Sequence, residues 1–152
     1  MPYLDPTEAS AAALIARRIE GPITMLNLLR FRAVADYSDD PELAPDEPIS
    51  GAEAYRRYAE HTTPHLLASG GEVLLEGSGG EFFIGPDDER WDHVLLVRQR
   101  SLDDFFAFAT NEAYLAGLGH RTAALEDSRL LPIASSVQVT ADSLPGHLPN
   151  LD

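Results

Sequence analysis

The chain has 152 residues, of which 44% are hydrophobic and 24% are charged, a composition typical of one globular domain with an apolar core. It contains no cysteine, which excludes disulfides, thiolate nucleophiles and cysteine metal centres. Its formal net charge is -14 and all of its cations are arginine, so contacts with nucleic acid or with anionic membranes are disfavoured.

The first predicted element is an N-terminal helix. Asp5 can cap it, Pro6 suits its first position, and Glu8 favours the positive end of its dipole. We expect this helix to end near Ile19, before Gly21-Pro22. Residues 23–32 then alternate as a strand whose two faces are both largely apolar, interrupted by Asn27 on one face and Arg30 on the other.

The acidic, proline-rich segment 36–48 predicts a solvated surface loop. A capping box at Ser50–Glu53 opens a helix to about Ser69, which Pro64 is expected to bend or split. Residues 72–85 indicate a strand, a glycine-rich turn or bulge and a continuation.

After a turn at 86–89, residues 91–99 predict another strand, and residues from Ser101 a short helix. A second helical segment is expected from Glu112 to about Asp127, followed by a last strand from Arg129 to Val139. Pro132 favours an edge position or an irregular start for that strand.

This order, a preliminary helix followed by βαββαβ, predicts an α+β, ferredoxin-like domain with a four-stranded antiparallel sheet and both main helices on one face. We treat residues 1–152 as a single domain, with a core over about 22–139, an N-terminal helix in 1–21 and a tail in 140–152. The other face of the sheet is apolar and uncovered, so we expect a homodimer through the sheet faces.

Four segments also resemble a known family: MLNLLRFR, AYRRYAEHT, WDHVLLVR and AYLAGLGHRTAALEDSRLLP. Together they are similar to domain-of-unknown-function family 1330, of the dimeric α/β-barrel superfamily. The resemblance covers about Pro22 to Pro132, and Tyr114, Leu118, Arg121 and Arg129 match typical family positions. It implies the fold and a back-to-back dimer, but no reaction. The wider superfamily includes cofactor-free monooxygenases, haem-degrading enzymes and lactone isomerases.

Adjacent His120 and Arg121 are the first site candidates. Arg121 lies on an apolar stripe with Tyr114 and Leu118 and has no carboxylate at helical spacing. Arg121 has three possible roles. It forms an ion pair with a protein carboxylate elsewhere in the fold, or its side chain extends to the surface, or it binds a carboxylate or enolate oxygen of a ligand. His120, on a face of small residues, is either a structural histidine or a general acid/base.

Asn27 is the third catalytic candidate, because a mid-strand amide can stabilise an oxyanion, or can instead hold a neighbouring loop. Asn27, Trp91 and His120 match the residue types that haem-degrading relatives in the superfamily use. That match is weak, and we expect no cofactor. His61 and His65 have a helical metal spacing, but Pro64 separates them and we expect no metal site.

Aromatic side chains are expected to line a cavity for a flat, mostly apolar molecule. The predicted ligand-pocket residues are Tyr55, Tyr58, His61, Trp91, Phe106 and Tyr114. The resulting prediction is a homodimer with a small-molecule cavity, acting as a cofactor-free monooxygenase or isomerase on a small aromatic or apolar anion. The alternative is a non-catalytic ligand-binding or stress-related module. The sequence has no signal peptide and no apolar run of membrane length, so we expect a cytoplasmic protein without membrane or nucleic-acid partners.

Overall fold

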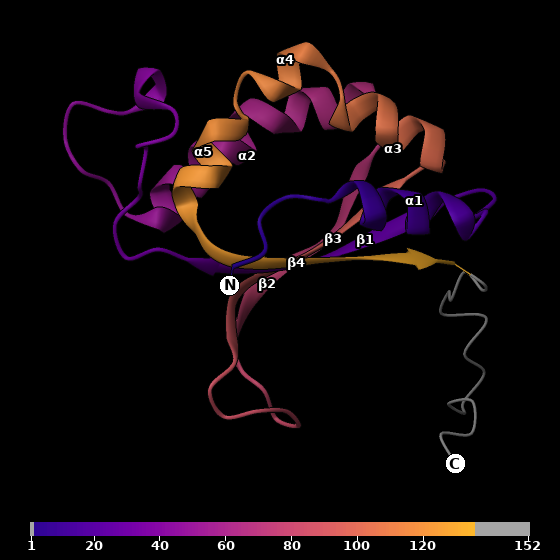
Figure 1. The fold of residues 1–152 in the computed structure, drawn as a ribbon, viewed down its shortest axis with the longest axis horizontal. Coiled ribbons are helices and arrows are strands. Elements are labelled where there is room, and N and C mark those ends of the chain that lie inside the picture. Colours follow the sequence, from indigo (N-terminus) through magenta and orange to yellow (C-terminus); the bar gives the residue numbers. More distant parts are fainter. Residues whose placement is uncertain (1, 136–152) are drawn as a thin grey trace.

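The computed structural model describes residues 2–135, so the predicted tail and the end of the predicted core lie outside these residues. The preliminary helix and the βαββαβ order are both present (Figure 1). The elements are α1 (Glu8–Ala16), β1 (Ile23–Phe31), the 3-10 turn η1 (Pro41–Leu43), α2 (Gly51–Ala68), β2 (Glu72–Glu81), β3 (Arg90–Gln99), α3 (Leu102–Ala109), α4 (Glu112–Leu115), α5 (Leu118–Ala124) and β4 (Leu125–Ala134).

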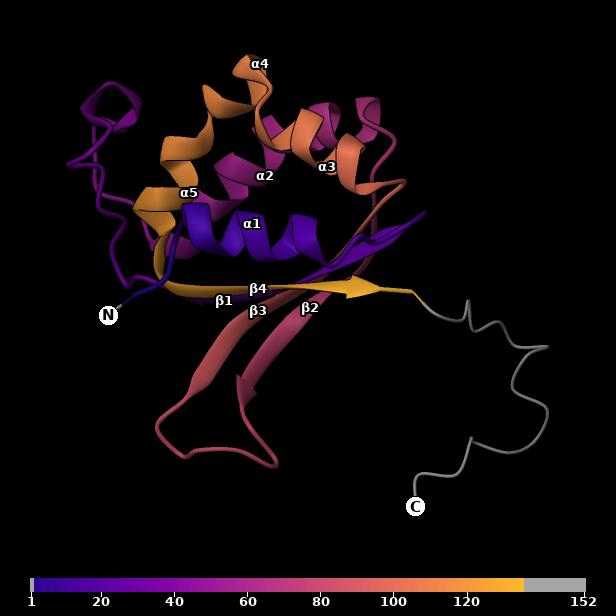
Figure 2. The same ribbon diagram turned by 45° about the vertical axis from the view of Figure 1, so that its right-hand side comes forward.

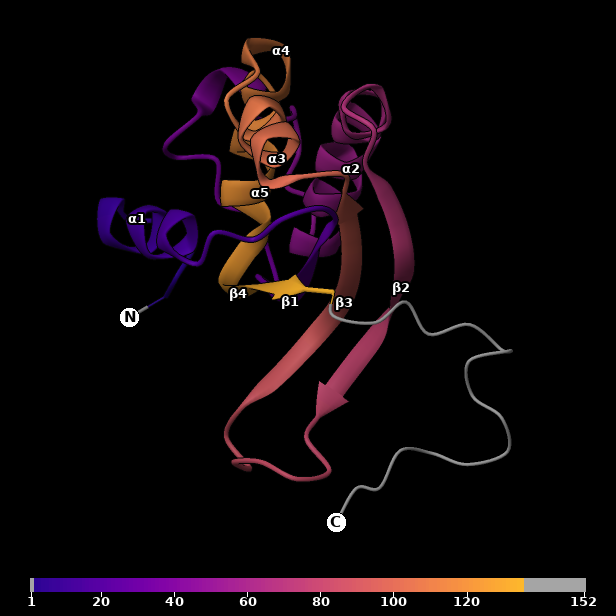
Figure 3. The ribbon, with the colours of Figure 1, turned by 90° about the vertical axis from the view of Figure 1, so that its right-hand side faces the viewer.

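The four strands form one antiparallel sheet in the order β2-β3-β1-β4. This order, with the first and third strands in the centre, confirms the ferredoxin-like α+β fold. Figure 1 shows α2, α3, α4 and α5 above one face of the sheet, and Figure 3 shows α1 on the same side, beyond the β4 edge. No helix within residues 2–135 is both long and apolar enough to cross a bilayer.

Alternation along β1 divides the sheet into a covered and an uncovered face. Leu29 is buried in a cluster with Ala54, Leu95 and the residues at the α5–β4 junction, and so faces the helices. Leu26 points the other way and pairs in register with Leu96 and Leu131. No helix of the described chain covers this second face, and Leu131 there keeps 56% of its surface exposed.

Pro64 was expected to bend or split this helix, and the split is wrong, because α2 continues through Pro64 to Ala68. A proline ring removes the hydrogen bond to the carbonyl four residues earlier, here that of Glu60. Both Pro64 and Glu60 are exposed, so water can solvate the freed carbonyl. The buried stripe of Tyr58, Thr62 and Leu66 holds the helix on the other side.

The glycine-rich segment is not a turn between strands. Gly77–Gly80 lie within β2 and pair with β3, and the turn of the hairpin follows later, after Glu81. The register between β2 and β3 shifts instead near Leu74, before the glycines. The long-range pairing with β3 compensates for the low strand propensity of glycine.

The segment 36–48 is not simply a solvated excursion. Asp36 donates its backbone N–H to the carbonyl of Ala123 at 2.9 Å, Tyr37 is buried in the core cluster, and η1 adds a turn at Pro41–Leu43. The loop is therefore anchored on α5 through its first residues.

Two expected helix boundaries also differ. Thr7, rather than Asp5, caps α1 and forms a reciprocal capping box with Ser10. The helix expected over residues 112–127 is instead α4 and α5, and the chain turns into β4 at Leu125 because residues from there on pair with β1. The expected edge position of Pro132 is confirmed, since β4 pairs only with β1.

Gly51 generates a test of this packing. It lies where α2 starts, and a Cβ there would meet the backbone oxygens of Arg32 and Ala124. Rigid backbone cannot yield as a flexible side chain does, so we expect Gly51→Ala to lower the free energy of unfolding by about 1–3 kcal/mol.

Urea denaturation would measure this loss. Gly77→Ala is the matched control, because a Cβ at Gly77 meets nothing within 4 Å. Equal stability of the two variants would contradict the close approach at Gly51.

Candidate functional site

Arg121 on α5 reaches the start of the chain and the last strand. One of its terminal nitrogens donates to the Leu4 carbonyl at 2.7 Å, and the other donates to the Ser128 hydroxyl at 3.3 Å. Both acceptors are neutral, and no carboxylate of the described residues lies within ion-pair distance of this guanidinium. The positive charge of Arg121 is therefore hydrogen-bonded but not neutralised.

Tyrosines from α2 and α4 form a cluster near this charge. The hydroxyls of Tyr58 and Tyr114 are 2.8 Å apart, and the ring of Tyr55 lies 5.3 Å from that of Tyr58. Burial raises the pKa of Tyr55 and of Tyr114 above the ordinary value, an effect that the charge of Arg121 opposes in both cases. These phenols are protonated at neutral pH, so they are hydrogen-bond donors near a cation.

Asn27 lies on the covered face of the sheet, between buried Met25 and buried Leu29, yet is itself only half-buried. Its amide nitrogen donates to the Met25 carbonyl at 3.2 Å. This bond uses one of the two amide hydrogens. Within residues 2–135, no other hydrogen bond of the Asn27 side chain is found.

His61 has a structural partner. Its Nε2 donates to the carbonyl of Ala113 at 2.7 Å, assuming that tautomer, and ties α2 to the start of α4. The His61 and His65 rings are 5.2 Å apart. Within residues 2–135, no group of three or more histidine or acidic side chains is arranged to hold a metal ion.

His120 has different surroundings from its neighbour Arg121. Its Nδ1 is 2.7 Å from the hydroxyl of Tyr37, which comes from the acidic loop. Burial lowers the pKa of His120, as do the charges of Arg57 and His61, while Asp40 opposes them. Burial also raises the pKa of Tyr37, which keeps the phenol protonated and able to donate to Nδ1.

Two of the predicted pocket residues, Trp91 and Phe106, have other neighbours. Trp91 is buried, and the guanidinium groups of Arg30 and Arg129 lie 5.2 and 5.0 Å from the centre of its ring. Phe106 packs on its neighbour Phe105, with ring centres 5.5 Å apart. From α3, Phe108 rather than Phe106 packs on Tyr114.

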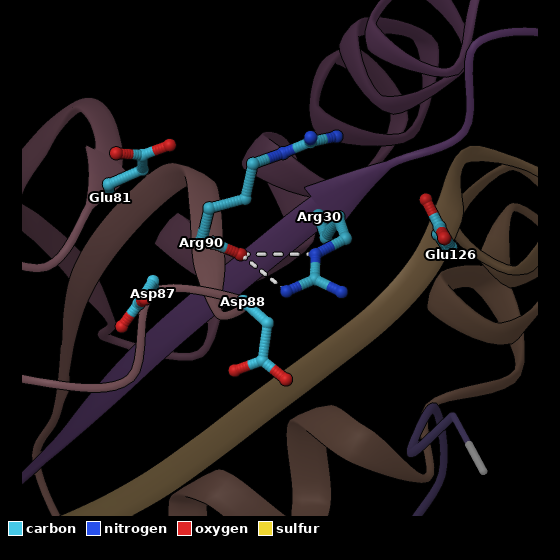
Figure 4. Close-up of a pocket in the computed structure, with 6 residues that line it drawn as sticks. All are labelled: Arg30, Glu81, Asp87, Asp88, Arg90 and Glu126. Atoms are coloured by element: carbon cyan, nitrogen blue, oxygen red, sulfur yellow. Dashed lines mark hydrogen bonds between the residues drawn. The ribbon is translucent and has the colours of Figure 1, made fainter.

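Two surface clefts lie elsewhere. One, of about 250 Å³, is lined by four carboxylates and two arginines, and in it the Arg30 guanidinium donates to the Arg90 carbonyl (Figure 4). The other, of about 320 Å³, lies between the end of α2 and α3 and includes His65, Arg100 and Phe108. Neither contains a residue that the sequence assigned to the pocket.

Three partners of His120 and Arg121 were missed from the sequence: Tyr37, Leu4 and Ser128. Tyr37 carries the only available signal, as a lone aromatic residue in an acidic loop. The other two act through a backbone carbonyl and a small hydroxyl, which have no distinctive pattern. Leu4 is 117 residues from Arg121, so only the fold could reveal that contact.

These features define a ferredoxin-like α+β protein with a cationic, tyrosine-rich region on the helical side of its sheet. No family model and no curated protein matches the chain. Among solved structures, it is similar to the RPA0582 protein of unknown function from Rhodopseudomonas palustris. Identity is 36% and the TM-score 0.80, over 91% of this chain and 100% of that chain.

The crystal structure of methylated RPA0582 protein gives 37% identity and a TM-score of 0.78, over 88% of this chain and 95% of that one. A dimeric protein of unknown function and ferredoxin-like fold from Bacteroides fragilis is more distant, with 16% identity and a TM-score of 0.47, over 77% and 99%. The chain belongs to the same family as RPA0582.

The surroundings of His120 predict a pH effect on stability. The folded-state pKa of His120 is lowered, so the unfolded chain binds the proton more readily. The stability that the neutral His120 contributes is complete above the pKa of this histidine in the unfolded chain, about 6.5. It is lost as the pH falls below that pKa. We expect His120→Gln to lose less stability than the unaltered protein between pH 7.5 and 5.

Urea unfolding across this pH range would measure the difference. Tyr37→Phe is a suitable comparison: it removes the hydroxyl but preserves burial, which is the largest cause of the shift. It should retain the pH dependence. If the free energy of unfolding changed with pH equally in His120→Gln and in the unaltered protein, the lowered pKa of His120 would be contradicted.

Proposed function

We propose that the chain is a homodimeric α/β-barrel protein that binds a small, largely apolar or aromatic molecule with an anionic oxygen, between its sheet and its helices. The observation that carries this proposal is the half-buried Arg121 guanidinium, whose partners in residues 2–135 are neutral oxygens. A buried cation without a counter-charge is costly. A ligand anion would supply that charge through a strong, charge-assisted hydrogen bond.

The tyrosines suit the rest of such a ligand. Their rings offer an apolar surface, and the raised pKa of Tyr55 and of Tyr114 keeps both hydroxyls protonated as donors. From the sheet, Asn27 has a second amide hydrogen for a ligand oxygen. A charged group, phenolic donors and an amide are typical of the few polar groups that orient a ligand in an apolar site.

A catalytic form of this proposal is a cofactor-free monooxygenase or a proton-shift isomerase, in which Arg121 and Asn27 stabilise an enolate or phenolate. Such chemistry also needs a proton carrier close to the ligand. His120, the expected carrier, is hydrogen-bonded to Tyr37 and has none of the Arg121 partners. This difference favours the second candidate, a non-catalytic small-ligand-binding or stress-related module.

Two further parts of the proposal concern assembly and family. The uncovered sheet face carries Leu26, Leu96 and Leu131 in one row across three strands, a pattern that favours a second sheet as its cover. We also infer that RPA0582 and this chain fall within domain-of-unknown-function family 1330, on the segments that resemble it.

Ligand binding can be tested with benzoate and its uncharged analogue benzamide. We expect benzoate, but not benzamide, to raise the melting temperature, because binding to the folded state stabilises it. Arg121→Gln should weaken benzoate binding about 10- to 100-fold, the usual effect of losing a hydrogen bond to a charged group. Calorimetric titration would give the affinities.

Ser128→Ala is the matched control, because it removes a neutral partner of Arg121 and leaves the charge in place. It should bind benzoate as the unaltered protein does. Equal responses to benzoate and benzamide, or full benzoate affinity in Arg121→Gln, would overturn the anion site.

The sheet-face dimer is tested by Leu131→Glu. Leu131 is exposed in the isolated chain, so the variant should fold, but an unpaired carboxylate in the dimer contact should weaken association at least about 100-fold. Leu130→Glu is the control, since alternation points that neighbour to the helical side. Sedimentation equilibrium would refute the sheet-face contact if both variants associated equally.

A further inference from the structure

The hairpin between β2 and β3 has an apolar tip. Phe83 is fully exposed, at 101%, and Ile84 is 88% exposed, larger fractions than for any other large apolar side chain within residues 2–135. Phe82 beside them is 42% exposed. Three consecutive apolar side chains in water are unusual for a chain with a net charge of -14, and such a patch marks an interaction surface.

The hairpin extends on the side of the sheet that lacks helices. In all three views the helices lie on one side of the sheet and the tip of the hairpin lies well beyond the other (Figures 1, 2 and 3). A protein bound to the uncovered face would therefore lie next to this hairpin. Residues 82–84 are then in position to contact its flank.

The area of the sheet face is too small for a stable dimer interface without a contribution from the hairpin. Four strands over the seven paired residues from Ile23 to Leu29 span only about 450 Å² at usual strand spacings. A stable interface buries about 800 Å² on each partner. A large aromatic side chain buries roughly 150–250 Å², so Phe83 and Ile84 would supply most of the difference.

The acidic residues that follow the tip line one of the two surface clefts. Asp87 and Asp88 line this cleft together with Arg30 and Arg90 (Figure 4). The tip itself, from Phe82 to Pro86, has no charge. It suits an apolar protein surface, while the net negative charge of the chain disfavours an anionic membrane.

We propose that residues 82–84 form an arm that clasps a second copy of this chain, extending the contact between the two sheets around its flank. This inference rests on the homodimer proposed above. A two-fold axis would give each copy one arm to donate and one to receive, so the contact closes without forming a chain of molecules. The arm therefore supplies affinity that the sheet face alone lacks.

The test is sedimentation equilibrium of the full chain with Phe83→Ser and Ile84→Ser combined. Both side chains are exposed in the single copy, so circular dichroism and melting at low protein concentration should match those of the unaltered protein. We expect the dimer dissociation constant to rise at least about 100-fold, from the loss of two buried apolar side chains. Leu67→Ser is the control, since Leu67 is 59% exposed on α2, on the helical side.

Three results are informative. A weakened dimer in the arm variant, with an unchanged dimer for Leu67→Ser, supports the clasp. A dimer of unaltered affinity in the arm variant overturns the clasp, while the sheet contact is judged separately by Leu131→Glu. A monomeric unaltered protein at the highest concentration overturns both the clasp and the homodimer, but leaves the benzoate experiment as an independent test of the ligand site.

Discussion

The rest of the structure depends on a backbone junction at the start of α2. There the N–H of Gly51 donates to the Arg32 carbonyl at 3.0 Å, and the N–H of Arg32 donates to the Ala124 carbonyl at 2.8 Å. These two bonds join the beginning of α2, the end of β1 and the end of α5 at one point. Only a residue without a side chain fits between these backbones, which fixes how the helices meet the sheet.

From this junction α2 and α5 pack against each other on the same side of the sheet, and the charge of Arg121 on α5 opposes the raised pKa of Tyr55 on α2. The same packing turns the preceding residue of α5, His120, towards the loop that contains Tyr37. Adjacent residues on a helix differ by about 100° in direction. One helix thus separates a cation near phenolic donors from an imidazole in a different environment, and the two need not share a function.

The order of elements and the fold could be predicted because apolar alternation and capping residues are local signals. The secondary-structure predictions are wrong where contacts with residues distant in the sequence outweigh the local conformational preference. Gly77–Gly80 have a turn-like composition, but β3 holds them in a strand. Leu125 follows a helical pattern, but pairing with β1 draws it into β4. Pro64 was expected to bend or split α2, but the helix is not split, because its buried residues Tyr58, Thr62 and Leu66 hold it on the other side.

In the candidate site, too, local features could be predicted and long-range contacts could not. The position of Arg121 on an apolar stripe, without a local carboxylate, could be read from spacing. Its actual partners could not, because a main-chain carbonyl near the start of the chain and a serine hydroxyl have no sequence signature. Trp91 and Phe106 were grouped with the tyrosines by residue type alone, whereas the neighbours that the structure gives them are Arg30 and Arg129 for Trp91 and Phe105 for Phe106.

The position of β1 in the centre of the sheet has a consequence for how the chain is made. Its register with β4 pairs Ile23 with Ala134, more than a hundred residues later. During synthesis, this edge of β1 stays open until almost the whole described chain has emerged, and an unpaired apolar strand is a template for aggregation. Contacts of such sequence separation also slow folding, so the final strand closes the domain late and limits its rate of maturation.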